Sequence, residues 1–216
     1  MEALILYLVL FFPGIYSFGI NGNSGGAINF SVIRELGRTL SYTIPSLALL
    51  WYIISDKNGF SALENEKPDL NDLVSFGIGL PGLIISGLGL SFLISVFSKF
   101  SELRAPALVE GPHNIPGFLV MVLSCVCTGY LEESFFRYYL LRKFEYILPQ
   151  TAIRIFISTA LFSLCHLYEG PWGILNAVLA GVLLSVLFVR FRSLHGIAWA
   201  HGAYNMFVYI VGSLSA

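Results

Sequence analysis

We predict that this chain is an all-α protein, a polytopic transmembrane bundle of about seven membrane helices. The first observation is composition, because 56% of the 216 residues are hydrophobic and only 12% are charged, whereas soluble domains carry about 25% charged residues. The second is length, since several apolar segments approach or exceed the roughly 18–20 residues that cross a hydrocarbon layer. The third is that loops rich in Gly, Pro or charged residues separate these segments.

Local signals bound each expected helix. The first three separators are a Gly/Asn/Ser loop (19–29), a charged loop (56–72) and a proline-containing linker (99–116). The last three are a proline turn (149), a Gly-Pro break (169–173) and a basic turn (190–193). The expected helices are therefore residues 3–19, 36–54, 73–98, 117–147, 151–167, 173–190 and 195–214. We see no repeats and expect a single transmembrane domain, 1–216, whose motif-bearing core lies at about 117–214.

Small residues indicate where helices approach one another. The third expected helix contains five glycines, Gly77, Gly79, Gly82, Gly87 and Gly89. The sixth carries Ala177, Gly181 and Ser185 at four-residue spacing, which places them on one face. Small side chains let membrane helices pack closely. Pro45, near the start of the second helix, is tolerated where neighbouring groups satisfy the carbonyl it frees.

Charge predicts orientation and excludes one class of partner. Seven Lys and Arg residues follow the second, fourth and sixth helices, namely Lys57, Lys67, Arg142, Lys143, Arg154, Arg190 and Arg192. Four lie on the opposite side, namely Arg34, Arg38, Lys99 and Arg104. Because the basic side is usually cytoplasmic, we expect a cytoplasmic N-terminus. A net charge of −1 without a basic stripe argues against nucleic acid as a partner.

The cysteines, Cys125, Cys127 and Cys165, are interpreted as small residues of the membrane core.

Three ionisable residues lie in the middle of the fourth expected helix. A charge at this depth costs at least about 2.5–3.5 kcal/mol, so such residues are usually paired and functional. Glu133 and Arg137 are four residues apart and can neutralise each other on one helix face. Glu132 points about 100° away and gains no such partner. We interpret the Glu133–Arg137 pair as structural and Glu132 as an unpaired carboxylate.

Two further helices bring polar residues to a similar depth. Glu132 and His166 are each seventeen residues from Pro149, so an antiparallel hairpin places them level with each other. His201 lies nine residues beyond Arg192, and Asn205 is on the same face one turn later. We therefore expect Glu132, His166, His201 and Asn205 to converge in one layer that opens toward the basic, cytoplasmic side. Taken singly, each residue has a structural alternative, such as a bond to a neighbouring backbone or to another helix.

Such a set of side chains suits the activation of water. A carboxylate withdrawn from water is a stronger base than one in water, and His166 can share the water with Glu132 or relay its proton. His201 and Asn205 are donors suited to an oxyanion on a peptide carbonyl, worth roughly 3–4 kcal/mol per donor in comparable sites. We expect no cofactor. A divalent metal such as zinc, held by Glu132, His166 and His201, is the alternative, although no HExxH occurs and Asn is a poor zinc ligand.

The three groups have the order and spacing Glu132-Glu133-x-x-x-Arg137, Phe162-x-x-x-His166 and His201-x-x-x-Asn205. Together they resemble the motifs of the CAAX-processing and bacteriocin-processing (CPBP, or Abi) intramembrane proteases, which include the type II CAAX prenyl endopeptidases. The resemblance implies a glutamate-dependent intramembrane endopeptidase in which Glu132 and His166 activate water and His201 and Asn205 form the oxyanion hole. Glu133, Arg137 and Phe162 would support them. The family has also been described as metalloproteases, and seven helices is one fewer than its CAAX proteases are thought to have.

The resemblance also implies partners and location. The expected partners are the lipid bilayer and a peptide or protein substrate, prenylated or not, in CAAX-type C-terminal processing or in peptide or bacteriocin maturation or immunity. The protein would be integral and multi-pass, in the plasma membrane of a prokaryote or the endoplasmic reticulum of a eukaryote. The alternative from another class is a non-catalytic membrane protein, such as an immunity factor, scaffold or transporter. Ser24, in a GxSG pattern within a polar loop, is a weak nucleophile candidate, as is Cys165 beside His166.

Overall fold

The computed structural model describes residues 1–21, 28–58, 67–97 and 109–214, and within these ranges it confirms the seven expected helices. Three of the seven helices are built from several consecutive pieces. In chain order the elements are α1 (Glu2–Asn21), β1 (Ile28–Asn29), α2 (Val32–Arg38), η1 (Thr39–Thr43), α3 (Ile44–Asn58), α5 (Leu70–Phe97), β2 (Val109–Glu110), α6 (Ile115–Glu133), η2 (Ser134–Leu141), α7 (Arg142–Glu145), α8 (Thr151–Leu164), η3 (Leu167–Glu169), α9 (Gly170–Phe191) and α10 (Leu194–Leu214). The Ser24 loop and parts of the 56–72 and 99–116 separators lie outside the described residues.

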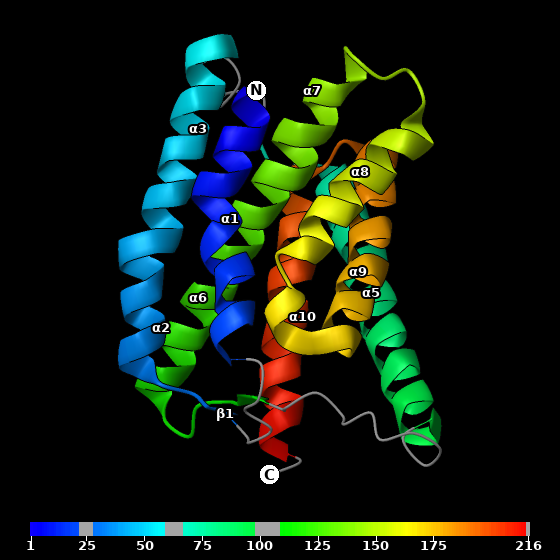
Figure 1. The fold of residues 1–216 in the computed structure, drawn as a ribbon. Helices are drawn as coiled ribbons and strands as arrows, with labels where there is room; N and C mark the ends of the chain where they lie inside the picture. Colours follow the sequence, from blue (N-terminus) through cyan, green and yellow to red (C-terminus); the bar gives the residue numbers. More distant parts are fainter. Residues whose placement is uncertain (22–27, 59–66, 98–108, 215–216) are drawn as a thin grey trace.

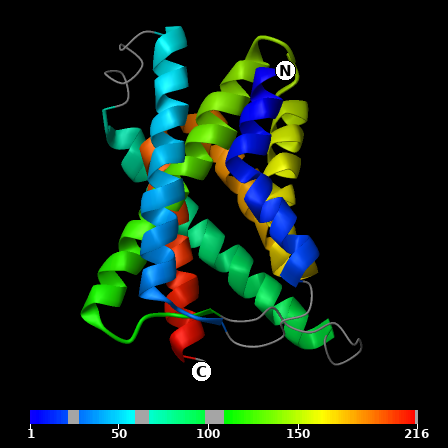
Figure 2. The same ribbon diagram turned by 60° about the vertical axis from the view of Figure 1, so that its left-hand side comes forward.

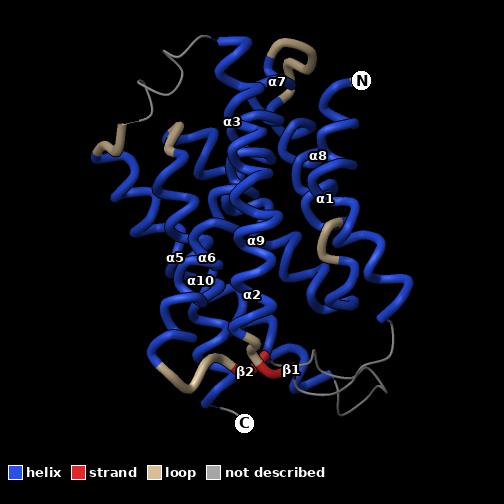
Figure 3. Tube along the Cα trace, turned by 90° about the vertical axis from the view of Figure 1, so that its left-hand side faces the viewer, coloured by secondary structure: helices blue, strands red, loops and turns tan. Residues whose placement is uncertain are grey.

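The helices form a bundle with the two chain ends at opposite ends (Figure 1). Helix α1 lies between the α2–α3 helix and α8 (Figure 2), and α10 packs against α5 and α6. The two strands pair in parallel as a two-stranded sheet near the C-terminus (Figure 3). Apart from these four strand residues, the described architecture is the predicted all-α bundle.

Within the described residues, three helices are long and apolar enough to cross a membrane, Leu70–Phe97, Ile115–Glu145 and Leu167–Phe191. The second of these runs without a break through α6, η2 and α7, and its central part, Ser134–Leu141, is wound as a π-helix. All eight side chains of that π-helix are buried. Its rings Phe135 and Phe136 pack against Phe11 of α1 and form the centre of the apolar core.

Helix α8 is short, and its length fixes where the chain turns. Fourteen residues rise about 21 Å, less than the roughly 30 Å of a hydrocarbon core. The turn through η3 into α9 therefore lies part-way down the bundle, above the C-terminal end of α10 (Figure 1). His166 is the residue immediately before η3. The local sequence thus places this histidine inside the bundle and not at its end.

A second π-helical turn, η1, joins α2 to α3. The amide of Ile44 bonds the carbonyl of Thr39, five residues earlier, immediately before Pro45. Proline has no N–H to continue the regular ladder, and a wider turn is one way in which a helix accommodates it. The helix predicted at 36–54 therefore continues through Pro45 without a break.

The predicted small-residue contacts are confirmed in part. Ala177, Gly181 and Ser185 are all buried on α9, and a Cβ on Gly181 would meet Thr159 of α8 at 2.9 Å. On α5, Gly79, Gly82 and Gly87 face side chains of α9 or α10, with Cβ positions within 3.0 Å of a neighbour. Gly77 and Gly89 have open space where a methyl group would lie. Their prediction as contact glycines was therefore wrong.

Candidate active site

A buried ionic network lies at the junction of α6 and η2. Arg137 donates from Nη1 to Glu133 Oε1 at 3.0 Å, and both side chains are fully buried. The guanidinium also donates from Nη2 to the carbonyl of Gly181 on α9 and lies over the ring of Phe162, 4.5 Å from its centroid. The predicted Glu133–Arg137 pair is thus confirmed. It ties three helices together.

His201 joins this network from α10. Its Nδ1 is 2.7 Å from Glu133 Oε1, the same oxygen that accepts from Arg137. A fully buried guanidinium requires a counter-charge, so Glu133 is ionised and can only accept. The hydrogen of the bond therefore belongs to Nδ1 of His201. Its other nitrogen, Nε2, is directed at Glu132, 3.6 Å from Oε2.

Glu132 is the carboxylate of this cluster that is open to a further group. Its Oε2 is buried yet has no hydrogen-bond partner among the residues the structure describes, and its side chain is 15% exposed. Glu133 also keeps one oxygen, Oε2, without a partner in the same ranges, but its side chain is 0% exposed. Adjacent carboxylates thus occupy different surroundings. Glu133 is enclosed and orients a histidine, and Glu132 is partly exposed and keeps an oxygen without a hydrogen-bond partner in the described ranges.

His166 approaches the cluster from the end of α8. Its Nδ1 is 2.9 Å from the carbonyl of Phe162, one turn earlier. The ring of Phe162 lies 4.6 Å from that of His166 and 5.9 Å from that of His201, centroid to centroid. Phe162 therefore packs against both imidazoles. Because one ring nitrogen of His166 bonds the helix backbone, the other is left to contact a ligand.

Asn205 lies one turn beyond His201 on α10 and is half-buried. Its neighbour Tyr204 is buried and donates to Asn176 Oδ1 of α9 at 3.0 Å. This bond fixes the rotation of α10 next to Asn205. The helix therefore places Asn205 on the same side as His201, as the four-residue spacing predicts.

A close crossing of α6 and α10 brings Glu133 and His201 together. A Cβ on Gly129 would lie 2.8 Å from the carbonyl of Ala198, and one on Gly202 would lie 3.1 Å from the carbonyl of Cys125. Glycine at both positions lets the two backbones touch. Gly129 precedes Glu133 by one turn and Gly202 directly follows His201, so the crossing sets the distance between these side chains.

Sequence reasoning missed both the Glu133–His201 bond and this crossing. The signal for the crossing was present, because Cys125 and Gly129 on α6, and Ala198 and Gly202 on α10, are small residues at four-residue spacing. The bond to Glu133 had no such signal. Which of two adjacent glutamates a histidine contacts depends on helix rotation, which local sequence does not specify.

The packing around Glu132 bears on the expectation that the polar layer opens toward the basic loops. On that side of Glu132 the whole segment Ser134–Leu141 is buried among aromatic rings. On the other side α8 ends and the chain turns through η3. The core therefore packs against the basic side of the cluster, and the end from which a substrate enters stays a prediction.

The arrangement of the side chains bears on the alternative of a metal site. Within the described ranges, no three His, Cys, Asp or Glu side chains gather so as to hold a metal ion. Glu132 and His201 approach each other, but His166 makes its hydrogen bond to Phe162. The described side chains thus do not fit a three-ligand zinc centre as they stand.

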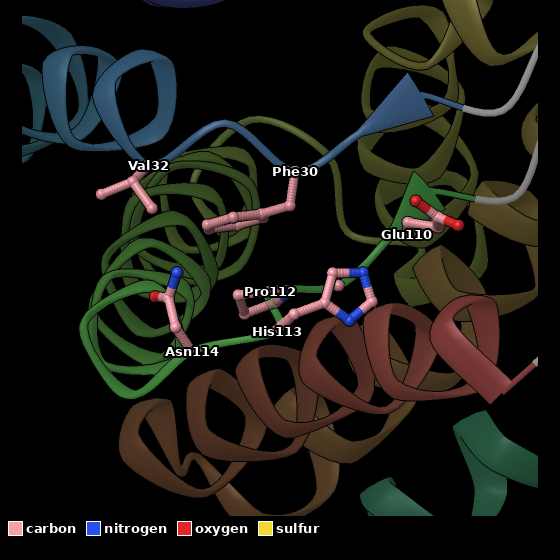
Figure 4. Close-up of a pocket in the computed structure, with 7 residues that line it drawn as sticks. Phe30, Val32, Glu110, Pro112, His113 and Asn114 are labelled. Atoms are coloured by element: carbon pink, nitrogen blue, oxygen red, sulfur yellow. The ribbon is translucent and has the colours of Figure 1, made fainter. Parts of the chain in front are cut away.

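A pocket of about 340 Å³ lies elsewhere, between the starts of α2 and α6. Figure 4 shows its lining of Phe30, Val32, Glu110, Pro112, His113 and Asn114, to which Gly111 also contributes. Asn114 precedes Glu132 by eighteen residues, about 27 Å along a helix. The pocket is therefore distinct from the Glu132 cluster.

Comparison with known protein families finds a match over the segment that carries the cluster. Residues 114–207 match the family described as Type II CAAX prenyl endopeptidase Rce1-like. Over this segment the chain is similar to the Rce1-like family. Glu132, His166, His201 and Asn205 all lie inside the matched segment. Comparisons with curated proteins and with solved structures found no match.

The similarity supports, at the level of the family, a CAAX-type protease that acts on a peptide or protein. Three of the described helices are apolar and long enough to span a bilayer, which together with this similarity supports an integral membrane protein. The predicted resemblance to CAAX-type proteases is thus confirmed.

Proposed function

We propose that this protein is an intramembrane endopeptidase that hydrolyses a peptide bond near the C-terminus of its substrate, with Glu132 as the base that activates water. The observation that carries the proposal is Glu132 Oε2, a buried carboxylate oxygen without a hydrogen-bond partner in the described chain, 3.6 Å from His201 Nε2. A water molecule beside this oxygen could donate a hydrogen bond to Glu132 Oε2 and also contact His201 Nε2. Carboxylates so placed are general bases.

In the proposed mechanism Glu132 removes a proton from water, whose oxygen attacks the substrate carbonyl. His166, with one nitrogen directed away from the α8 backbone, assists at the water or relays the proton to the leaving amine. The hydroxyl of water is thereby added to the carbonyl carbon, the C–N bond breaks, and the amine receives the proton. Each proton transfer of this kind contributes about 100- to 10,000-fold.

His201 and Asn205 are proposed to stabilise the negative charge on the carbonyl oxygen. Since Nδ1 of His201 donates to Glu133, its Nε2 can donate to an oxyanion only when the ring is protonated. The ionised Glu133 favours that form, and Arg137 holds Glu133 in place. Glu133 and Arg137 are thus positioning residues. Asn205 supplies a second, neutral donor.

The experiment compares two Glu→Gln variants of the purified protein in lipid nanodiscs. The probe is an internally quenched peptide that ends in farnesylcysteine followed by three apolar residues with a free carboxylate, assayed beside its unprenylated counterpart. We expect Glu132→Gln to lower kcat/KM about 100- to 10,000-fold. The matched control, Glu110→Gln in the pocket of Figure 4, removes a carboxylate outside the cluster and is expected to stay within about twofold of the wild type.

Two outcomes would contradict the proposal. The first is cleavage by Glu132→Gln at more than a tenth of the wild-type rate with the same thermal transition as the wild type. The second is a wild-type protein that cleaves neither peptide. A parallel assay with a strong chelator tests the mechanism separately, since metal-independent hydrolysis is expected to continue at an unchanged rate.

A further inference from the structure

A second charged network lies on the side of Glu132 that faces the C-terminal end of α10. Arg38 of α2 donates from Nη2 to Glu35 Oε2 and to Ser124 Oγ of α6, each at 2.9 Å, and from Nε to Glu35 Oε2 at 3.2 Å. Its Nη1 makes no hydrogen bond within the described chain. The Arg38 side chain is 42% exposed, while that of Glu35 is 10% exposed. Nε and Nη2 of the guanidinium are therefore held rigidly, and Nη1 is open.

Two helices place Arg38 at the same interval from the Glu132 cluster. On α6, Ser124 precedes Glu132 by eight residues, about 12 Å of helix. On α10, Tyr209 follows His201 by eight residues, and its phenol interacts electrostatically with Arg38. The helices are antiparallel, so both intervals run in the same direction, away from the basic end. Arg38 therefore lies about 12 Å below the proposed catalytic layer.

The interval between Arg38 and the Glu132 cluster is polar. Thr128 of α6 and Asn205 of α10 are each half-way along it, and Thr128 Oγ1 is buried without a hydrogen-bond partner among the described residues. Tyr42 and Tyr168, from the other side, each interact electrostatically with both Glu132 and Arg38. An extended peptide inside a membrane must find hydrogen-bond partners for its backbone. This interval provides them between the two charged ends.

We propose that Arg38 binds the C-terminal carboxylate of the substrate, so that the peptide bond at Glu132 lies about three residues before the end of the chain. This rests on the function proposed above. An extended chain spans at most about 3.3–3.6 Å per residue, and three residues therefore cover about 10–11 Å, close to the interval along α6. The N–H groups of Nη1 can donate charge-assisted hydrogen bonds to a carboxylate. The fragment released keeps its carboxylate on Arg38 and carries the new amino group at the catalytic end.

The test measures how strongly each variant prefers a free carboxylate over an amide. The probes are the quenched farnesylated peptide with three residues after the cysteine, its C-terminal amide, and a version extended by two residues. For the wild type we expect kcat/KM on the free acid to exceed that on the amide and on the extended peptide about 10- to 100-fold, the usual size for a lost hydrogen bond to a charged group. In Arg38→Gln the ratio of kcat/KM on the free acid to that on the amide, and to that on the extended peptide, is expected to fall to about 1.

The matched control is Arg34→Gln. Arg34 also pairs with Glu35, at 3.6 Å, but lies one turn away from the Ser124 contact, and its ratio is expected to equal that of the wild type. Because Arg38→Gln removes the cation nearest to Glu35, the double variant E35Q/R38Q, which removes both charges, is assayed as well. It is expected to show the same ratio of about 1.

The outcomes separate the two proposals. Wild-type cleavage that is abolished by Glu132→Gln but shows no preference for the free acid would leave the catalytic site standing and overturn the role of Arg38. A preference that survives in both Arg38→Gln and the double variant would overturn it too. If the wild type cleaves no probe, both proposals are wrong.

Discussion

The two halves of the bundle on either side of Glu132 treat charge in opposite ways. Toward the basic loops, Glu133, Arg137 and the π-helix Ser134–Leu141 are buried, and the ion pair is bonded to two other helices. Toward the C-terminus, Arg38 and Glu132 are partly exposed. The half toward the basic loops is therefore a scaffold, whose charges hold side chains in place. The half toward the C-terminus keeps polar atoms of Arg38 and Glu132 without hydrogen-bond partners in the described chain, and these could contact a ligand.

The largest effect is expected from breaking the scaffold ion pair. Arg137→Met leaves the ionised Glu133 buried without its cation, which typically costs about 3–5 kcal/mol. We expect a lowered thermal transition in detergent and loss of peptide cleavage. The double variant E133Q/R137M removes both charges and is expected to recover most of the transition temperature but not the activity, because His201 loses its orienting partner. A single Arg137→Met variant that unfolds with the wild type would contradict the scaffold role.

A smaller effect, on activity alone, is expected on the open side. Asn205→Ala removes a proposed oxyanion donor, and comparable deletions cost about 100- to 1000-fold in kcat. Since Asn205 is half-buried on α10, the thermal transition should remain near that of the wild type. Steady-state kinetics with the quenched peptide separates kcat from KM. A change confined to KM would place Asn205 in binding and not in transition-state stabilisation.

The smallest effect concerns the crossing that joins the two halves. Gly129→Ala places a methyl group 2.8 Å from the Ala198 carbonyl, so α6 and α10 must separate slightly. A misplacement near 1 Å can cost about 100-fold in rate, and a smaller shift should cost about 10- to 100-fold. Gly89→Ala is the control, because no atom lies within 4 Å of its methyl position. Equal activities of the two variants would show that the crossing does not set the geometry of the site.

Much of the fold could be predicted from the sequence. Helix positions follow from apolar runs and their Gly, Pro and charged separators, because lipid forces backbone groups to bond within each segment. The Ala177–Gly181–Ser185 face was also visible as a four-residue repeat. The glycines of α5 were less informative. Gly77 and Gly89 lie in the same glycine-rich helix as Gly79 and Gly82 but face open space. Only the rotation of the helix about its axis distinguishes the two pairs of glycines.

The candidate residues were predictable in kind, though not in their contacts. Glu132, His166, His201 and Asn205 stood out as polar side chains in apolar helices, and the Glu133–Arg137 pair followed from its spacing. The sequence did not show that His201 bonds Glu133 while facing Glu132. It also did not show that Phe162 packs against both histidines, or that Arg38 of α2 donates to Ser124 of α6. Each of these joins residues that are more than twenty positions apart or that compete for one partner.

The sequence by itself determined that this is a membrane helix bundle, which helices it has, and which polar groups lie deep within them. Hydropathy and helical spacing are local, and the cost of burying a charge makes each exception visible. Only the tertiary structure decided how the helices are rotated about their axes, and with this which glutamate is enclosed and which is open. These outcomes depend on close contacts such as Gly129 with Ala198, which form only when the whole bundle packs.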